Sequence, residues 1–319
     1  IAVGACHQDC GAVRFGCQSG VSFTHQFGDF DVGSNNYACT AFGGFDELIA
    51  FPPLKTPPAN DWHEERGFDP DLSDPVLDTR EVTLRLSATD QEDYECIVRM
   101  LGVSPVIDVR APSIGRSWSL RFIAPTGGAH ASSFGLKFAD DTPMQGYTYQ
   151  PPNAEKEREW ILSTSRRDDF VITESPKRSF ADYGARVLGD VVDEMERRNE
   201  VKTGLLRKFS TKPGAFYDKD AMFFEKGGDR QVQLLMRADT LAELWRNYDA
   251  LLFDLIRPGA RRYKKAPFYY SSCRVDKFIP DEPRPWLQFT TKVVPNFLTT
   301  NYDHLFPRGR NAPRRDARR

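Results

Sequence analysis

Residues 80–88 read REVTLRLSA, and residues 230–238 read RQVQLLMRA. Apolar and polar residues alternate in both, which is the pattern of a strand with one buried face. A Thr-x-x-Glu box follows each stretch, at Thr89 and at Thr240, and its side chains satisfy free backbone N–H groups at a helix start. We therefore expect a strand followed by a helix at both places.

The residues before these strands repeat as well. Three landmarks recur 147 residues later: Asp46-Glu47-Leu48 as Asp193-Glu194-Met195, Lys55-Thr56 as Lys202-Thr203, and Gly67 as Gly214. The strands themselves lie 150 residues apart. A period of this size is the length of a domain, far above that of a solenoid repeat. The 319 residues therefore predict two tandem copies of one domain.

The remaining pattern predicts a mainly β (α+β) fold: two homologous antiparallel β-sandwich or barrel domains, each with one flanking helix. The first helix carries an apolar stripe and ends at Gly102, and the second ends at Pro258-Gly259. Four later segments alternate like half-buried strands. Their apolar faces are Trp118, Leu120 and Phe122; Phe134, Leu136 and Phe138; Tyr269, Ser271, Cys273 and Val275; and Leu287, Phe289, Thr291 and Val293.

The expected organisation has five parts. An N-terminal arm (1–26) precedes the first module (27–150), a linker (151–175) and the second module (176–300), and an Arg-rich tail (301–319) ends the chain. The tail is expected to be flexible, with binding to an acidic surface as the alternative.

The composition excludes several classes of protein. The 40% hydrophobic and 28% charged residues are typical of a soluble globular protein. A net charge of −2 gives no general attraction to nucleic acid or anionic membrane. No apolar stretch is long enough for a membrane helix. Six cysteines are too few for a disulfide scaffold, and with the absence of an Asn-x-Ser/Thr site they favour a reducing cytoplasm.

Few residues suggest chemistry. Cys6, His7, Cys10 and Cys17 are zinc-ligand types, but their spacing lacks the two short pairs of a structural site, and an arm with incidental cysteines is the preferred interpretation. Neither a Gly-x-Ser-x-Gly elbow nor a phosphate-binding loop is present, and His130 beside Gly127-Gly128 suits a turn. We expect no catalytic, cofactor-binding or metal site, and hence no enzyme.

Two long polar loops, 49–79 and 196–229, occupy the same place in both copies. Residues 61–78 of the first are strongly acidic, whereas the second carries Arg207, Lys208 and Lys212. The calcium-loop spacing of an EF-hand is absent. The acidic loop is a solvated surface, or it pairs with the basic loop between subunits, or it faces a channel; a metal-dependent hydrolase using these carboxylates is the least favoured alternative.

The two modules resemble tail proteins of long-tailed bacteriophages, in particular distal tail, tail-tip ring or baseplate hub proteins with tail-tube-like modules. The resemblance covers about residues 27–300. Besides the repeated landmarks, it is carried by Phe27-Gly28-Asp29-Phe30, Phe180-Ala181-Asp182-Tyr183, Thr240-Leu241-Ala242-Glu243-Leu244-Trp245, Tyr269-Tyr270-Ser271-Ser272-Cys273-Arg274-Val275 and Trp286-Leu287-Gln288-Phe289.

This resemblance implies a structural virion protein, assembled in the host cytoplasm, that forms a ring at the distal end of the tail. The ring is either a pseudo-sixfold trimer or a hexamer. Its expected partners are the tail tube protein, tail-tip or hub proteins and receptor-binding proteins, with DNA only passing through and no membrane insertion. The alternative is a two-module carbohydrate-binding or adhesion protein, which needs an exposed aromatic platform drawn from Trp62, Trp118, Trp245 and Trp286.

Overall fold

The structure is a computed structural model of the chain. It describes residues 29–295 except 33–34, 56–58, 61–68, 71–75, 88–90, 104–105, 112–113, 131–132, 144–147, 165–168, 190, 198–199, 201–205, 218–227, 258–260 and 265. The expected N-terminal arm with its Cys6, His7, Cys10 and Cys17, the Arg-rich tail and the Thr89 box all lie outside the described residues.

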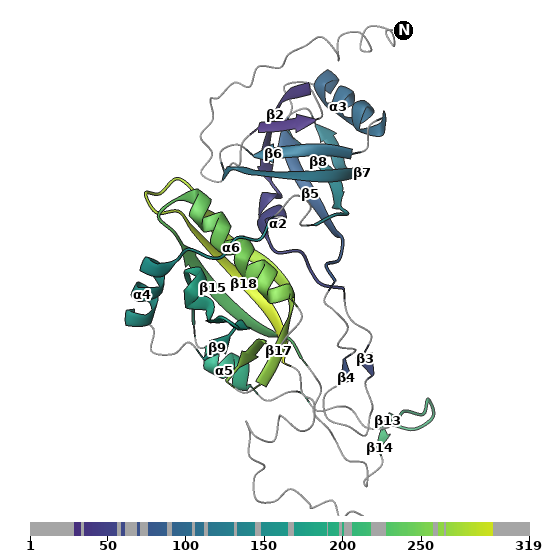
Figure 1. Cartoon of the computed structure of the whole chain (residues 1–319). Coiled ribbons are helices and arrows are strands. Elements are labelled where there is room, and N and C mark those ends of the chain that lie inside the picture. The colour runs from purple at the N-terminus through teal and green to yellow at the C-terminus, as the bar shows by residue number, and fades with distance from the viewer. Residues whose placement is uncertain are drawn as a thin grey trace, which may run out of the picture.

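The protein is mainly β, with two six-stranded antiparallel sheets and few helices, as expected (Figure 1). The first sheet has the order β1-β2-β5-β8-β7-β6. Its strands are β1 (Asp29–Val32), β2 (Asn35–Gly43), β5 (Arg80–Ser87), β8 (Ser133–Asp140), β7 (Arg116–His130) and β6 (Val106–Ala111). Helix α2 (Phe45–Ile49) follows β2, helix α3 (Gln91–Val103) follows β5, and a small pair, β3 (Ala59–Asn60) and β4 (Asp69–Pro70), lies between β2 and β5 in the chain.

The second sheet has the order β12-β15-β18-β17-β16-β9. Its strands are β12 (Ala185–Val187), β15 (Arg230–Arg237), β18 (Trp286–Pro295), β17 (Ala266–Ile279), β16 (Arg261–Tyr263) and β9 (Phe170–Val171). The accompanying elements are α4 (Glu155–Thr164), β10 (Thr173–Glu174), β11 (Lys177–Arg178), η2 (Phe180–Tyr183), α5 (Val191–Glu196), β13 (Leu206–Arg207), β14 (Phe216–Tyr217) and α6 (Leu241–Ile256).

Five strands occupy matching places in the two sheets. The run β2-β5-β8-β7-β6 of the first sheet corresponds to β12-β15-β18-β17-β16 of the second, both in space and in chain order. In each copy a long helix follows the same strand in the chain: α3 lies between β5 and β6, and α6 lies between β15 and β16. The repeated sequence therefore encodes the same strand order twice.

The expected alternation places the core correctly in most strands. Val82 and Leu84 of β5 are buried, and so are their counterparts in β15, Val232, Leu234 and Met236. All four residues of the expected inner face of β18, from Leu287 to Val293, are at most 1% exposed. The period-two pattern was thus sufficient to find the buried face of these strands.

The expected face of β17 is wrong at its start. Tyr270 is fully buried, whereas Tyr269 and Ser271 are only partly so, and the next inward residue is Cys273. The pairing of β17 with β18 shifts by one residue between Tyr270 and Ser272. A β-bulge of this kind inserts one extra residue and so moves the alternation to the opposite parity, which the sequence pattern does not reveal.

The expected linker contains regular structure. Helix α4 lies within residues 151–175, and β9 pairs with β16 at the edge of the second sheet. Glu157, in the charged run of α4, is buried and forms ion pairs with Arg237 and Arg284. The segment therefore packs onto the second domain. Among the helices of the described part, none has the length and apolarity needed to cross a membrane.

Helix α6 starts and ends where the sequence predicts. Thr240 is its N-cap, its hydroxyl oxygen accepts from the backbone N–H of Glu243 at 3.2 Å, and the last helical residue precedes Pro258 by two positions. Replacing Thr240 with alanine is expected to lower the free energy of unfolding by about 1 kcal/mol, because one N–H group of the first turn loses its acceptor. Urea denaturation measures this loss. Thr240→Ser keeps the hydroxyl and should recover most of the stability; equal losses in both variants would contradict the capping role.

Candidate assembly surfaces

The repeated Asp-Glu-Leu/Met landmark contacts the first long strand in both copies, at strand positions two residues apart. The Glu47 carboxylate accepts from the backbone N–H of Thr83 in β5 at 3.3 Å. The Glu194 carboxylate accepts from the backbone N–H of Gln231 in β15, also at 3.3 Å. The residue after each glutamate, Leu48 or Met195, is buried. The landmark therefore attaches a short helix to the first long strand of each sheet.

An arginine at the start of that strand completes the attachment. Arg80 donates to the backbone carbonyls of Ala50 (2.5 Å) and Leu48 (3.0 Å), at the end of α2. Arg230, its counterpart, donates to the carbonyl of Arg197 at 2.9 Å, just after α5. The last carbonyls of a helix have no intrahelical partner, and a cation there also meets the negative end of the helix dipole. This explains why an arginine opens both repeated strands.

After this shared unit the two copies diverge. The first continues with Phe51, whose ring enters the second domain between α6 and the sheet. Its ring centroid lies 4.1 Å from that of Tyr248, 6.0 Å from that of Tyr270 and 5.9 Å from that of Phe289. We call the space lined by these three rings the Phe51 slot. In the second copy the residue 147 positions after Phe51 is Arg198, an arginine in place of the phenylalanine, and it lies outside the described residues.

Polar contacts hold the inserted segment in the Phe51 slot. The Tyr248 hydroxyl donates to the Ile49 carbonyl at 2.9 Å, and the Tyr270 hydroxyl donates to the Pro52 carbonyl at 3.0 Å. Burial raises the pKa of both tyrosines well above the ordinary value, so both remain donors. Burial likewise raises the pKa of the Cys273 thiol, which lies against this segment, to about 12. The slot thus holds neutral, non-titrating groups.

A second contact joins the β6–β7 turn of the first domain to α6. Arg116 forms a two-point ion pair with Asp249, with N–O distances of 3.0 and 2.7 Å, and its guanidinium lies 4.2 Å from the ring centroid of Trp245. The Trp245 indole N–H donates to the carbonyl of the buried Ile114 at 2.6 Å. Burial raises the pKa of Asp249, and Arg116 counteracts this by favouring the carboxylate.

These two contacts connect the domains through one helix. Tyr248 of the Phe51 slot and Asp249 of the Arg116 pair both stand on α6, and the buried apolar residues of both sheets belong to one continuous core. An interface built from core residues of this kind fixes the relative orientation of two domains. The two sheets therefore pack around one shared core that includes α6.

The tryptophans proposed for a carbohydrate platform are mostly engaged elsewhere. Trp118 and Trp245 are 8% and 7% exposed, as expected for core residues. The Trp286 indole N–H donates to Glu282 at 3.0 Å, and the Lys277 ammonium lies 5.1 Å from its ring centroid. Trp62 lies outside the described residues. The described tryptophans of this set do not form an exposed platform.

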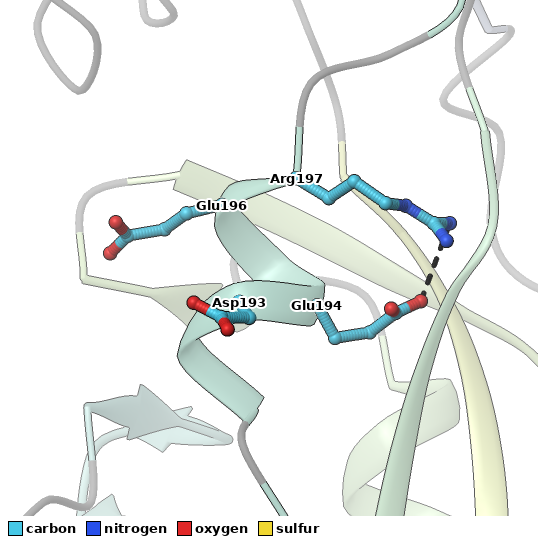
Figure 2. Close-up of a pocket in the computed structure, with 4 residues that line it drawn as sticks. All are labelled: Asp193, Glu194, Glu196 and Arg197. Carbon is cyan, nitrogen blue, oxygen red and sulfur yellow. Dashed lines mark ion pairs between the residues drawn. The ribbon is translucent and has the colours of Figure 1, made fainter.

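A shallow hollow lies over helix α5, lined by Asp193, Glu194, Glu196 and Arg197 (Figure 2). Glu194 pairs with Arg197 at 3.4 Å, and Glu196 points away from this pair and binds Lys264. Each of these two glutamates is therefore already paired with a cationic side chain. The described residues contain no group of histidine, cysteine or acidic side chains placed to hold a metal ion.

The two long loops carry matching hairpins. Strands β3 and β13 begin 147 residues apart, and so do β4 and β14, which is the spacing of the sequence landmarks. Both hairpins project away from the two sheets (Figure 1). Arg207 ends β13, and Lys208 and Lys212 lie in the exposed connection that follows it. We call residues 57–75 the acidic arm and residues 204–222 the basic arm.

The contacts that join the two sheets are the Phe51 slot and the Arg116 pair. Sequence reasoning identified the arms and their opposite charge, but it missed Phe51 and Arg116. Their partners lie more than 130 residues away in the chain, and neither residue stands in a motif. In comparisons with known proteins, no family model, no curated protein and no solved structure matches this chain.

Proposed function

We propose that the chain is a structural virion protein that forms a ring at the distal end of a bacteriophage tail and joins the tail tube to the tip or baseplate. The observation that carries this proposal is the pair of antiparallel sheets that share the order of five strands and are joined by the insertion of Phe51. Two modules joined in this way make a unit from which a closed ring can be built with few copies.

In this proposal the modules are tail-tube-like, and three chains supply six of them. A pseudo-sixfold trimer can face a sixfold tube on one side and a threefold tip on the other, which accounts for a duplicated chain. The different loops and the one-sided insertion of Phe51 distinguish the two modules, so a hexamer with one module inside and one outside is the second stoichiometry. The partners are the tube protein, hub proteins and receptor-binding proteins, and DNA passes through the lumen.

Sedimentation velocity on the purified chain, followed by negative-stain electron microscopy, tests this proposal. We expect trimers or hexamers that appear as annuli with a central opening, because closed rings leave no unpaired joining surface. Adding a tail tube protein should produce stacked particles. A chain that stays monomeric at micromolar concentration and binds glycans would contradict the ring and favour an adhesion protein.

A further inference from the structure

We propose that neighbouring chains meet through two surfaces of the second domain: the tip of the β13–β14 hairpin of one copy binds the outer face of helix α4 of the next copy. This inference rests on the proposed ring function and names the surfaces that meet. We call residues 208–216 the hairpin tip, and we call the side chains of Glu155, Glu159 and Leu162 the α4 face. The inference is carried by apolar exposure on both surfaces, by their opposite charge, and by their positions in the fold.

The hairpin tip exposes apolar surface. Phe209 and Phe216 are 50% and 51% exposed, and their ring centroids lie 5.8 Å apart. All residues from 208 to 216 are exposed, and β13 and β14 form a two-stranded sheet of their own. Two adjacent phenyl rings on such a projection form an exposed apolar patch, which marks an interaction site. Because the folded chain leaves both rings half uncovered, we expect another molecule to cover them.

The charge of the hairpin tip is positive. Lys208 and Lys212 are its only charged residues, and the Lys212 ammonium lies 5.7 Å from the ring centroid of Phe216. Neither ammonium group forms an ion pair with any residue that the structure describes. The tip is therefore an apolar patch with a cationic rim, and it suits a partner surface that is acidic and partly apolar.

Helix α4 presents such a surface. Glu155, Glu159 and Leu162 follow the i, i+4, i+7 spacing and therefore lie on one face of the helix. All three are exposed, and Leu162 is 45% exposed. The buried residues of the helix, Glu157 and Ile161, stand on the opposite face, toward the second domain. The α4 face thus points away from the rest of its own chain.

The two carboxylates of the α4 face are available for a partner. Lys156 and Arg158, the cations of this helix, bind other carboxylates of the second domain, at 3.0 and 2.7 Å. Among the described residues, the side chains of Glu155 and Glu159 have no hydrogen-bonding or ion-pair partner. Two carboxylates beside an exposed leucine match two lysines beside two phenyl rings. Such complementarity steers two surfaces together and discourages contact between like surfaces.

The positions of the two surfaces favour a contact between copies. Figure 1 shows α4 and the β13–β14 hairpin on opposite sides of the second sheet. A tip on one side of a chain and its receptor on the other side give a head-to-tail contact, which repeats from copy to copy and closes into a ring when the rotation permits. The partner of the hairpin tip is therefore a second copy of this chain.

Charge reversal tests the contact. One variant, Lys208→Glu with Lys212→Glu, makes both surfaces acidic; the other, Glu155→Lys with Glu159→Lys, makes both surfaces basic. Each variant alone should associate about tenfold more weakly or worse, because like charges then face each other. A chain with all four substitutions should assemble as the wild type does. The measurement is sedimentation velocity.

Mixing the two charge variants tests whether the contact joins different chains. An equimolar mixture with one variant fluorescently labelled should restore association, and only between unlike chains. Unlike chains alternate around a ring only if their number is even. The mixture should therefore form closed rings if the wild type is a hexamer, and open assemblies if it is a trimer.

Removing the phenyl rings tests the apolar part without altering any charge. Phe209→Ala with Phe216→Ala should also weaken association about tenfold, while the urea midpoint stays at the wild-type value because both rings are half exposed. This variant keeps the test decisive if a charge variant fails to fold. Unchanged association of the phenylalanine variant would show that the rings are not covered in the oligomer.

The matched control is Lys177→Glu with Lys292→Glu, which reverses two exposed lysines outside both surfaces and should leave assembly unchanged. If the wild type forms oligomers and the variants of both surfaces assemble equally well, the contact is wrong while the ring proposal stands. If the four-substitution chain recovers but the mixture does not, the surfaces meet within one chain and the proposed partner is wrong. A monomeric wild type would overturn both proposals.

Discussion

Replacing Phe51 with alanine is expected to lower the free energy of unfolding by about 3–5 kcal/mol, the cost of emptying an aromatic site in a core. The ring is 2% exposed and contacts three aromatic rings of the other domain. Because the loss falls at the junction, the second domain should unfold before the first, so we expect one denaturation transition for the wild type and two for the variant. Urea denaturation followed by near-ultraviolet circular dichroism and tryptophan fluorescence measures both effects.

Phe209→Ala is the matched control, because it makes the same chemical change at a half-exposed ring. Its expected effect is within about 0.5 kcal/mol. Cys273 provides an independent readout. We expect its thiol to alkylate slowly, because burial raises its pKa to about 12, and peptide-level mass spectrometry should show faster alkylation of Cys273 in Phe51→Ala. Unchanged alkylation together with unchanged stability would show that Phe51 does not fill the slot in solution.

Replacing Arg116 with alanine is expected to lower the free energy of unfolding by about 3 kcal/mol, because it leaves the carboxylate of Asp249 buried without its partner. The side chains of this pair are 10% and 21% exposed, so water cannot fully replace the guanidinium. The substitution also removes the cation over the Trp245 ring. Arg121→Ala is the control: its ion pair with Asp141 is 48% and 39% exposed, and its loss should cost about 1 kcal/mol or less.

The loss in the free energy of unfolding caused by Arg116→Ala should depend on pH. Burial already raises the pKa of Asp249, and removing Arg116 raises it further, because the guanidinium favours the charged form. A carboxyl group whose folded pKa exceeds its unfolded pKa destabilises the fold as pH rises through the folded value. The deficit relative to the wild type should therefore be larger at about pH 7 than at about pH 5. A deficit that grows on acidification would show that Asp249 is not the group responsible.

Local patterns in the sequence predicted much of the fold. The alternation in residues 80–87 and 230–237, the Thr240 cap and the helix stop before Pro258 each depend on neighbouring residues and were found correctly. The 147-residue spacing even extends to hairpins in loops that carry no strand pattern. A sequence repeat thus predicts a shared backbone structure even in segments where strand propensity gives no prediction.

Long-range features could not be predicted in the same way. The bulge in β17 depends on pairing with β18 and has no marker in the sequence. The charged run of α4 resembles a linker because the partners of Glu157, Arg237 and Arg284, stand some 80 or more residues later. Phe51 follows a helix and precedes two prolines, which suits a surface loop equally well. Its burial is decided by a slot that the first domain does not contain.

The insertion of Phe51 has a consequence for how the chain is made. Tyr248 emerges from the ribosome 199 residues after Ile49, the residue whose carbonyl it will bind. At about 5–20 residues per second, the apolar segment waits on the order of 10–40 s for its receptor to be synthesised. A nascent first domain therefore exposes an apolar segment that only the complete polypeptide can bury. Premature termination would release a product prone to aggregation.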